Sequence, residues 1–246
     1  LPNGLLGISP VGIRAGRHSP LLPPWPDLVI ATGRRLAPIA RWIRRQSRGC
    51  SCIVHLGRRG AYNPEHFDLV VSCAHFALMP HVRRMEVVAP VNPIGPSRLA
   101  QAATRWPNLF GHAPRPHIVL LVGGTSSFCS FDEEAARRLG REVRAFAASA
   151  GGTVHAVTSR RTGERQASAL EEELGKSHSV RRWQPTSNEN PYLGYLATAD
   201  VHVVTGDSES MLAEAVASGK PVYIYPLPEC FPGTLGKVRE QFREWV

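Results

Sequence analysis

The chain has 246 residues, 43% of them hydrophobic, so it is long enough to bury one large core or two modest ones. No apolar run approaches the roughly 18 residues of a membrane helix, and the proline-rich start does not resemble a signal peptide. The five cysteines contain no C-x-x-C pair, which argues against a disulfide framework or a zinc cluster. The net charge of +9 is concentrated in residues 1–95, which hold 12 arginines and 4 acidic residues, but aromatic residues do not interleave with the basic ones as they do on nucleic-acid binding surfaces. We expect a globular cytoplasmic protein that binds no nucleic acid.

Residues 1–95 have the pattern of one basic α/β domain. Short apolar runs predict strands over 27–33, 51–57, 67–72 and 85–90, and an amphipathic pattern predicts a helix over 36–46. That helix carries apolar residues on one side and a group of basic residues, Arg41, Arg44, Arg45 and Arg48, near its end. Two interpretations stay open: the helix lies on an anionic membrane surface, or it is the solvated side of an ordinary sheet-covering helix. The first places the protein at the periphery of the inner face of a membrane.

A proline-rich stretch separates this domain from a second α/β series. Residues 96–116 are expected to form an interdomain connection, and residues 117–235 a second domain. There we predict strands over 117–124, 152–159 and 179–183 and helices over 131–149 and 192–198. Residues 236–246 are expected to form a helix that packs back on the first domain.

The stretch from Val201 to Leu227 predicts a strand, a turn, a helix and a second strand, which is a parallel crossover unit. Gly206 and Asp207 make the turn, and the free N–H groups at the start of the helix, with Ser208 and Ser210, can hold a phosphate. Glu214 lies four residues beyond Ser210, roughly 6 Å along the helix axis, and a carboxylate accepts two hydrogen bonds from a ribose diol. The alternative is that these residues only cap and solvate the helix.

Three further loops follow predicted strands of the second domain, and the carboxyl ends of parallel strands meet at one edge of a sheet. A small-residue turn suits close approach of an anion, paired arginines suit phosphate, and a polar loop can contact a base. Any one of these loops alone is more often an ordinary surface turn, but their convergence predicts a nucleotide-sugar site without a metal. The candidate residues in these loops are Gly123, Gly124, Thr125, Ser126, Ser159, Arg160, Gln184, Glu189 and Asn190.

Five motifs in order resemble the plant mitochondrial-fission, elongated-mitochondria family and its bacterial relatives. They are "PPWPDLVIATGRRLAPIARWIRR", "LLVGG", "TSRRT", "ENPYLGYLATAD" and "DSESMLAEAVASGKPVYIYPLP". The last also resembles the nucleotide-sugar motif of GT-B glycosyltransferases. The resemblance implies an α/β fold of two Rossmann-like domains that face each other across a cleft. It also implies that Glu214 binds ribose, that Ser208, Ser210 and the Gly123–Gly124 turn contact phosphates, and that the loop 184–189 holds the base.

The resemblance favours a glycosyltransferase that passes a sugar from a nucleoside diphosphate to an acceptor held by the first domain. The nucleotide sugar is then a substrate, and no cofactor or metal is required. Two alternatives stay open: a nucleotide-sugar epimerase of the same fold, and a non-enzymatic scaffold in membrane or organelle organisation. No catalytic residue is assigned, because His55 and Glu65 suit a base by type but such residues are more often structural.

Overall fold

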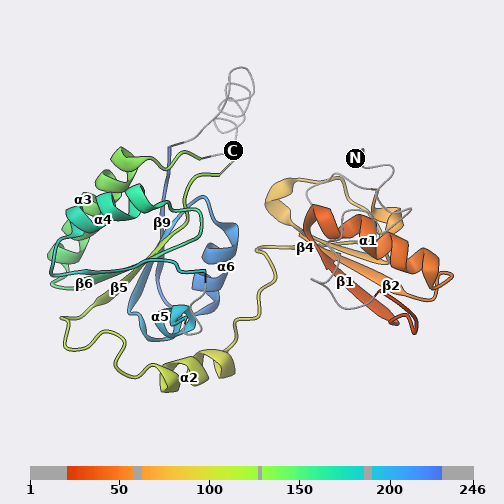
Figure 1. Cartoon of the computed structure of the whole chain (residues 1–246), viewed down its shortest axis with the longest axis horizontal. Helices are drawn as coiled ribbons and strands as arrows, with labels where there is room; N and C mark the ends of the chain where they lie inside the picture. The colour runs from red at the N-terminus through yellow and green to blue at the C-terminus, as the bar shows by residue number, and fades with distance from the viewer. Residues whose placement is uncertain (1–20, 58–62, 127–128, 186–189, 229–246) are drawn as a thin grey trace. The chain divides into compact units, whose positions relative to one another are not determined.

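The computed structural model describes residues 21–57, 63–126, 129–185 and 190–228, and these residues form two separate parallel sheets (Figure 1). The chain divides into two compact units, Leu1–Val91 and Asn92–Val246. The predicted α/β class with parallel sheets is confirmed, while the facing of two domains across a cleft stays a prediction. None of the described helices is both long enough and apolar enough to cross a membrane.

The first unit is a four-stranded sheet in the order β1-β2-β3-β4. The core lies under α1, where Ala37 and Ala40 pack against Ile53 and Val70 of the neighbouring strands and against Phe67. Small alanines on the inner side of α1 let the helix lie close to the sheet. Its elements are β1 (Leu28–Thr32), α1 (Gly33–Gln46), β2 (Cys52–Leu56), β3 (Leu69–Cys73) and β4 (Arg84–Val87), with short 3₁₀ turns η1 (Pro64–His66) and η2 (Ala74–Phe76).

The second unit is a five-stranded parallel sheet in the order β7-β6-β5-β8-β9. Its strands are β5 (His117–Val122), β6 (Thr153–Thr158), β7 (Ser179–Arg181), β8 (Val201–Thr205) and β9 (Val222–Tyr225). Its helices are α2 (Pro96–Arg105), α3 (Glu133–Ser149), α4 (Glu164–Leu174), α5 (Tyr192–Thr198) and α6 (Glu209–Ala217).

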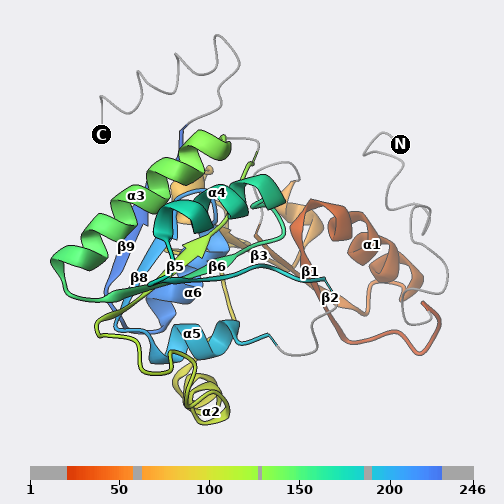
Figure 2. The ribbon, with the colours of Figure 1, turned by 60° about the vertical axis from the view of Figure 1, so that its left-hand side comes forward.

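Helices cover both faces of this second sheet (Figure 2). The central strand β5 is buried along its whole length, so its side chains enter two cores in alternation. Leu120 and its neighbours on one face pack against α3 and α4, and Leu121 on the other face packs against α5 and α6.

The order of the strands creates a switch point between β5 and β8. From β5 the chain runs outward to β6 and β7, and it then returns to β8 on the other side of β5. Loops that leave the carboxyl ends of these two strands therefore diverge, and ligands of open α/β sheets bind in such crevices.

The predicted elements agree with the observed ones to within a few residues, with two exceptions. The helix α4 was not predicted, although Ala167, Leu170 and Leu174 give it a buried apolar side. Residues 96–116, expected to be a connection, belong to the second unit, where α2 packs beside α5. A side chain at Gly194 of α5 would meet Trp106 at 3.0 Å. The predicted C-terminal helix, 236–246, lies outside the described residues.

Candidate functional site

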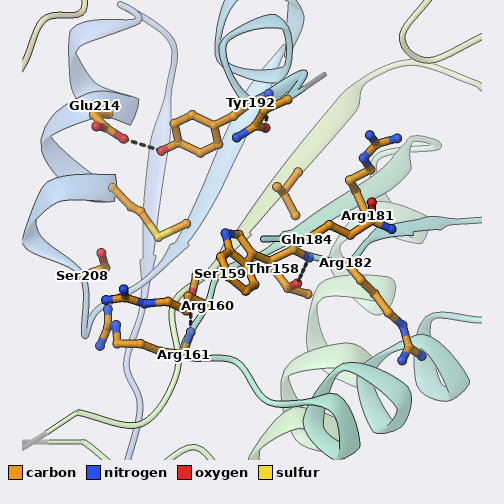
Figure 3. Close-up of a pocket in the computed structure, with 14 residues that line it drawn as sticks. Thr158, Ser159, Arg160, Arg161, Arg181, Arg182, Gln184, Tyr192, Ser208 and Glu214 are labelled. Carbon is orange, nitrogen blue, oxygen red and sulfur yellow. Dashed lines mark hydrogen bonds between the residues drawn. The ribbon is translucent and has the colours of Figure 1, made fainter. Parts of the chain in front are cut away.

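A pocket of about 360 Å³ lies at the carboxyl ends of β6 and β7 and beside α6 (Figure 3). Four loops or helices contribute side chains to it, all from the second unit. Six of the residues predicted from sequence line it: Ser159, Arg160, Gln184, Asn190, Ser208 and Glu214. The structure thus brings together residues from positions 159 to 214, as expected for one edge of a parallel sheet.

One end of the pocket has the character of an anion site. Arg160 and Arg161 follow β6, and they lie near Ser208 at the start of α6 (Figure 3). Ser208 occupies the N-cap position, but its side chain makes no capping hydrogen bond. Arg160 is exposed and has no ion-pair partner within the described part of the chain. Two guanidinium groups, a hydroxyl and a helix N-terminus therefore converge on one region, where they suit the oxygens of a phosphate.

Asp207 has a different position from the one predicted. Its side chain is 0% exposed, and it is not among the residues that line the pocket. The carboxylate accepts hydrogen bonds from the Gly124 N–H at 3.0 Å and from the Thr205 hydroxyl at 2.7 Å, and it pairs with Arg161 at 2.8 Å. Asp207 therefore joins three loops of the sheet edge and holds Arg161 in place beside the pocket.

The Gly123–Gly124 turn is shaped by this carboxylate. A side chain at Gly123 would meet Asp207 at 2.2 Å, and one at Gly124 would meet the backbone carbonyl of Arg161 at 2.1 Å. The Gly123 N–H donates to the Thr205 hydroxyl at 2.8 Å. Both backbone donors of the turn are thus used within the protein, so the glycines serve close packing of the loops in this arrangement.

Four of the remaining predicted residues, Thr125, Ser126, Gly206 and Ser210, are not among those that line the pocket. Thr125 and Ser126 close the loop after β5 through hydrogen bonds to the backbone of Phe131 and Cys129. The N–H of Gly206 donates to the carbonyl of Tyr225 on the neighbouring strand at 2.9 Å. Ser210 is exposed on α6 and does not line the pocket. Glu189 lies outside the described residues.

The other end of the pocket holds a carboxylate oriented by a tyrosine. The Tyr192 hydroxyl, at the start of α5, donates to Glu214 Oε2 at 2.6 Å (Figure 3). Burial, and then the bond to Glu214, raises the pKa of Tyr192 well above its usual range, so it remains a donor. This bond fixes one carboxylate oxygen and leaves the other to accept further hydrogen bonds.

Sequence reasoning missed Tyr192, and it also missed the contribution of Trp183. The side chain of Trp183 lines the pocket and is 41% exposed, and its backbone N–H donates to the Thr158 hydroxyl at 2.8 Å. The next residue toward β7, Arg182, pairs with Glu164 and Glu171 of α4. The backbone that carries Trp183 is therefore tied to β6 and α4. An aromatic residue at the end of the short strand predicted over 179–183 was the available signal.

Comparison with known proteins identifies the family. The family described as Mitochondrial fission ELM1 matches residues 7–244. The chain belongs to this family. The mitochondrial fission protein ELM1 of Arabidopsis thaliana is 29% identical over 227 residues, and the match covers 83% of this chain and 52% of the plant protein. This chain thus spans about half the length of that relative. An uncharacterized protein, RP120, of Rickettsia prowazekii (strain Madrid E) is 24% identical over 261 residues. This match covers 93% of this chain and 73% of that protein.

A solved structure supports the fold. The UDP-GlcNAc 2-epimerase of Neisseria meningitidis, bound to UDP-GlcNAc, superposes with a TM-score of 0.50 at 12% sequence identity. The match covers 81% of this chain and 59% of the epimerase. At this identity the likeness concerns the fold alone, and it supports a GT-B-like α/β fold for this member of the ELM1 family.

Proposed function

We propose that the pocket of the second unit binds a nucleoside diphosphate sugar and that the protein is a glycosyltransferase. The observation that carries the proposal is the pairing of two unlike ends in one pocket. Arg160, Arg161 and the start of α6 suit a diphosphate at one end, and the Glu214 carboxylate suits the two hydroxyls of a ribose at the other. The volume of about 360 Å³ lies in the range of small-molecule sites.

Trp183 supplies a surface for the base in this proposal. Its ring is partly exposed in the pocket wall, and stacking of a base on an aromatic ring contributes about 1 to 3 kcal/mol. Gln184 and Asn190 provide amide groups for the edge of the base. This role agrees with the family resemblance.

The chemistry proposed is transfer of the sugar with departure of the diphosphate. Negative charge develops on the leaving phosphate oxygens, and Arg160, Arg161 and the N–H groups at the start of α6 stabilise it. Asp207 orients Arg161 for this task through their 2.8 Å ion pair. The acceptor site belongs to the first unit in this proposal, with the two units facing across a cleft.

The test is incubation of the full chain with labelled nucleotide sugars, followed by analysis of the products. Label found on an acceptor together with free nucleoside diphosphate supports transfer. Conversion of the sugar to its epimer without an acceptor supports an epimerase. Binding without turnover supports a non-enzymatic scaffold, a role compatible with the fission function named for the Arabidopsis relative. The absence of nucleotide binding contradicts the proposal at its first step.

A further inference from the structure

Two exposed cysteines stand one residue apart where the chain of the first unit enters its second strand. Cys50 follows the turn after α1, and Cys52 is the first residue of β2. Both are free and exposed, whereas Cys73 is buried and Cys129 is half-buried. Among the cysteines that the structure describes, Cys50 and Cys52 are therefore the two that a reagent in solution reaches most easily.

Hydrogen bonds hold this short stretch of backbone in place. The residue between the two cysteines, Ser51, is 1% exposed, and its hydroxyl donates to the Pro26 carbonyl at 2.7 Å. The Cys52 N–H donates to the Asp27 carbonyl, also at 2.7 Å. The side chain of the middle residue is thus turned inward, while the cysteines on either side of it are open to solvent.

The backbone bends at Ser51, and this bend favours a bridge between its two neighbours. Two residues of fully extended chain span roughly 6.6 to 7.2 Å, whereas the Cα atoms of bridged cysteines are usually about 4.4 to 6.8 Å apart. A straight strand therefore places cysteines of this spacing near or beyond the limit for a disulfide. A change of chain direction between them shortens the separation of their Cα atoms.

A bridge across a single residue has the properties of a labile disulfide. Disulfides stabilise a fold mainly by closing a long loop of the unfolded chain, and this bridge closes almost none. A ring this small also strains the disulfide geometry, and strained or exposed disulfides are the ones that are reduced easily. The pair therefore suits a reversible change of redox state and not a structural role.

We propose that Cys50 and Cys52 form a reversible dithiol–disulfide pair that exchanges with small disulfides such as oxidised glutathione. One cysteine sulfur attacks a sulfur of oxidised glutathione, which forms a mixed disulfide and releases one glutathione thiol. The second cysteine sulfur attacks the protein sulfur of the mixed disulfide, which closes the bridge and releases the other glutathione thiol. Two electrons thereby pass from the protein to oxidised glutathione, and the two protons of the cysteine thiols end on the two glutathione molecules. The exchange involves the first unit alone, so it holds whether or not the second unit binds a nucleotide sugar.

The experiment is incubation of the full chain with oxidised glutathione, followed by acid quenching, alkylation of the free thiols and mass spectrometry. Trypsin cleaves after Arg48 and Arg58, so both cysteines fall in the peptide 49–58. The wild-type peptide should lose both alkylation sites and retain no glutathione, and an excess of reduced glutathione should restore both sites. Cys50→Ser and Cys52→Ser each leave one thiol, so each variant should retain glutathione as a mixed disulfide.

Several results of this experiment would overturn the proposal. They are an unreacted wild-type peptide, glutathione retained on it, a bridge to another cysteine or to a second chain, and a bridge that reduced glutathione does not open. Phenylarsine oxide gives a second measurement on the reduced native chain, because its arsenic atom binds two neighbouring thiols at once. It should block both cysteines of the wild-type peptide, and either serine variant should lose this protection. Equal uptake by the serine variants would show that the two thiols do not act as a pair.

Discussion

The carboxylate of Asp207 connects the loops that surround the pocket of the second unit. Its three partners follow β5, end β8 and follow β6, so a single buried side chain holds the positions of three loops. Each partner donates a hydrogen bond, and a buried donor that loses its acceptor costs about 1 to 3 kcal/mol. The geometry of the end of the pocket that carries Arg160 and Arg161 thus depends on a residue that does not line it.

The contact between Gly123 and Asp207 gives a first prediction. Gly123→Ala places a methyl group 2.2 Å from the carboxylate, so the loops must separate, and overpacking of this kind costs about 1 to 3 kcal/mol of unfolding free energy. Gly206→Ala is the matched control in the same region, because its added methyl group would meet Ile224 and Tyr225 at an ordinary 3.5 Å. Urea denaturation of both variants measures the difference. Equal stability of the two would show that Asp207 has room to move.

Glu214 gives a second prediction, on affinity. Glu214→Gln keeps an acceptor for the Tyr192 hydroxyl but removes the charge, and a hydrogen bond to a charged group is stronger than a neutral one by about 1 kcal/mol. With two ribose hydroxyls bound, the affinity for uridine diphosphate should fall by about 10- to 100-fold in isothermal titration. Glu214→Ala is a poorer probe, because it also leaves the buried Tyr192 hydroxyl without its acceptor.

Tyr192→Phe serves as the control for this experiment. It removes the bond between the two side chains and leaves the Glu214 charge in place, so its effect on affinity should be much smaller. If Glu214→Gln bound uridine diphosphate as tightly as the wild type, the ribose contact would have to lie elsewhere.

At the scale of the elements, one face of the second sheet carries buried histidines. Burial is the main cause that lowers the pKa of His155 on β6 and of His202 on β8, in each case to about 4. His117 and His178 lower the pKa of His155 further, and Lys220 lowers that of His202. Both imidazoles are therefore neutral at pH 7, and they become charged on unfolding below pH 6.5.

A third prediction follows for acid stability. The pKa of each histidine is lower in the folded chain than in the unfolded chain, so the unfolded chain binds more protons between these two values. The stability that the neutral histidines contribute is therefore fully present above about pH 6.5 and is lost as the pH falls toward 4. Each histidine contributes a decrease of up to about 1.4 kcal/mol per pH unit in that range. Urea midpoints between pH 7 and 4.5 measure the slope. His155→Gln should reduce it, and His112→Gln, on an exposed loop, should not; an unchanged slope in His155→Gln would contradict the assignment.

Most strands of both units could be predicted from the sequence because they contain compact runs of valine, isoleucine and leucine between turn residues; the short strands β4 and β7 hold one valine each. The loops that carry the site could also be predicted, because parallel strands place their carboxyl ends at one edge of the sheet. The role of Asp207 could not be predicted from the sequence. Its partner Gly124 is 83 residues away, and the local pattern around Asp207 shows only a residue type that caps helices. Likewise, the prolines of residues 96–116 indicated turns but gave no sign that Trp106 packs on α5.

At the scale of the whole molecule, two sheets in two compact units lead to a fourth prediction. Differential scanning calorimetry of the full chain should resolve two transitions, and uridine diphosphate should raise only that of the second unit. A ligand at about 100 times its dissociation constant adds roughly 2.7 kcal/mol, which corresponds to roughly 5 to 10 °C for a unit of this size. Gly123→Ala lowers the same transition and so identifies it. A single transition that shifts as a whole would show that the units unfold together.

The bonds around Asp207 also bear on how the second unit reaches its native state. They join Gly124, Arg161, Thr205 and Asp207, so they close only after three strand crossovers have formed. Contacts of such long sequence separation form late, since the chain must first lose the entropy of the intervening loops. The end of the pocket that carries Arg160 and Arg161 is therefore completed near the end of folding, and the proposed nucleotide binding should lag behind the recovery of helix and sheet in a refolding experiment.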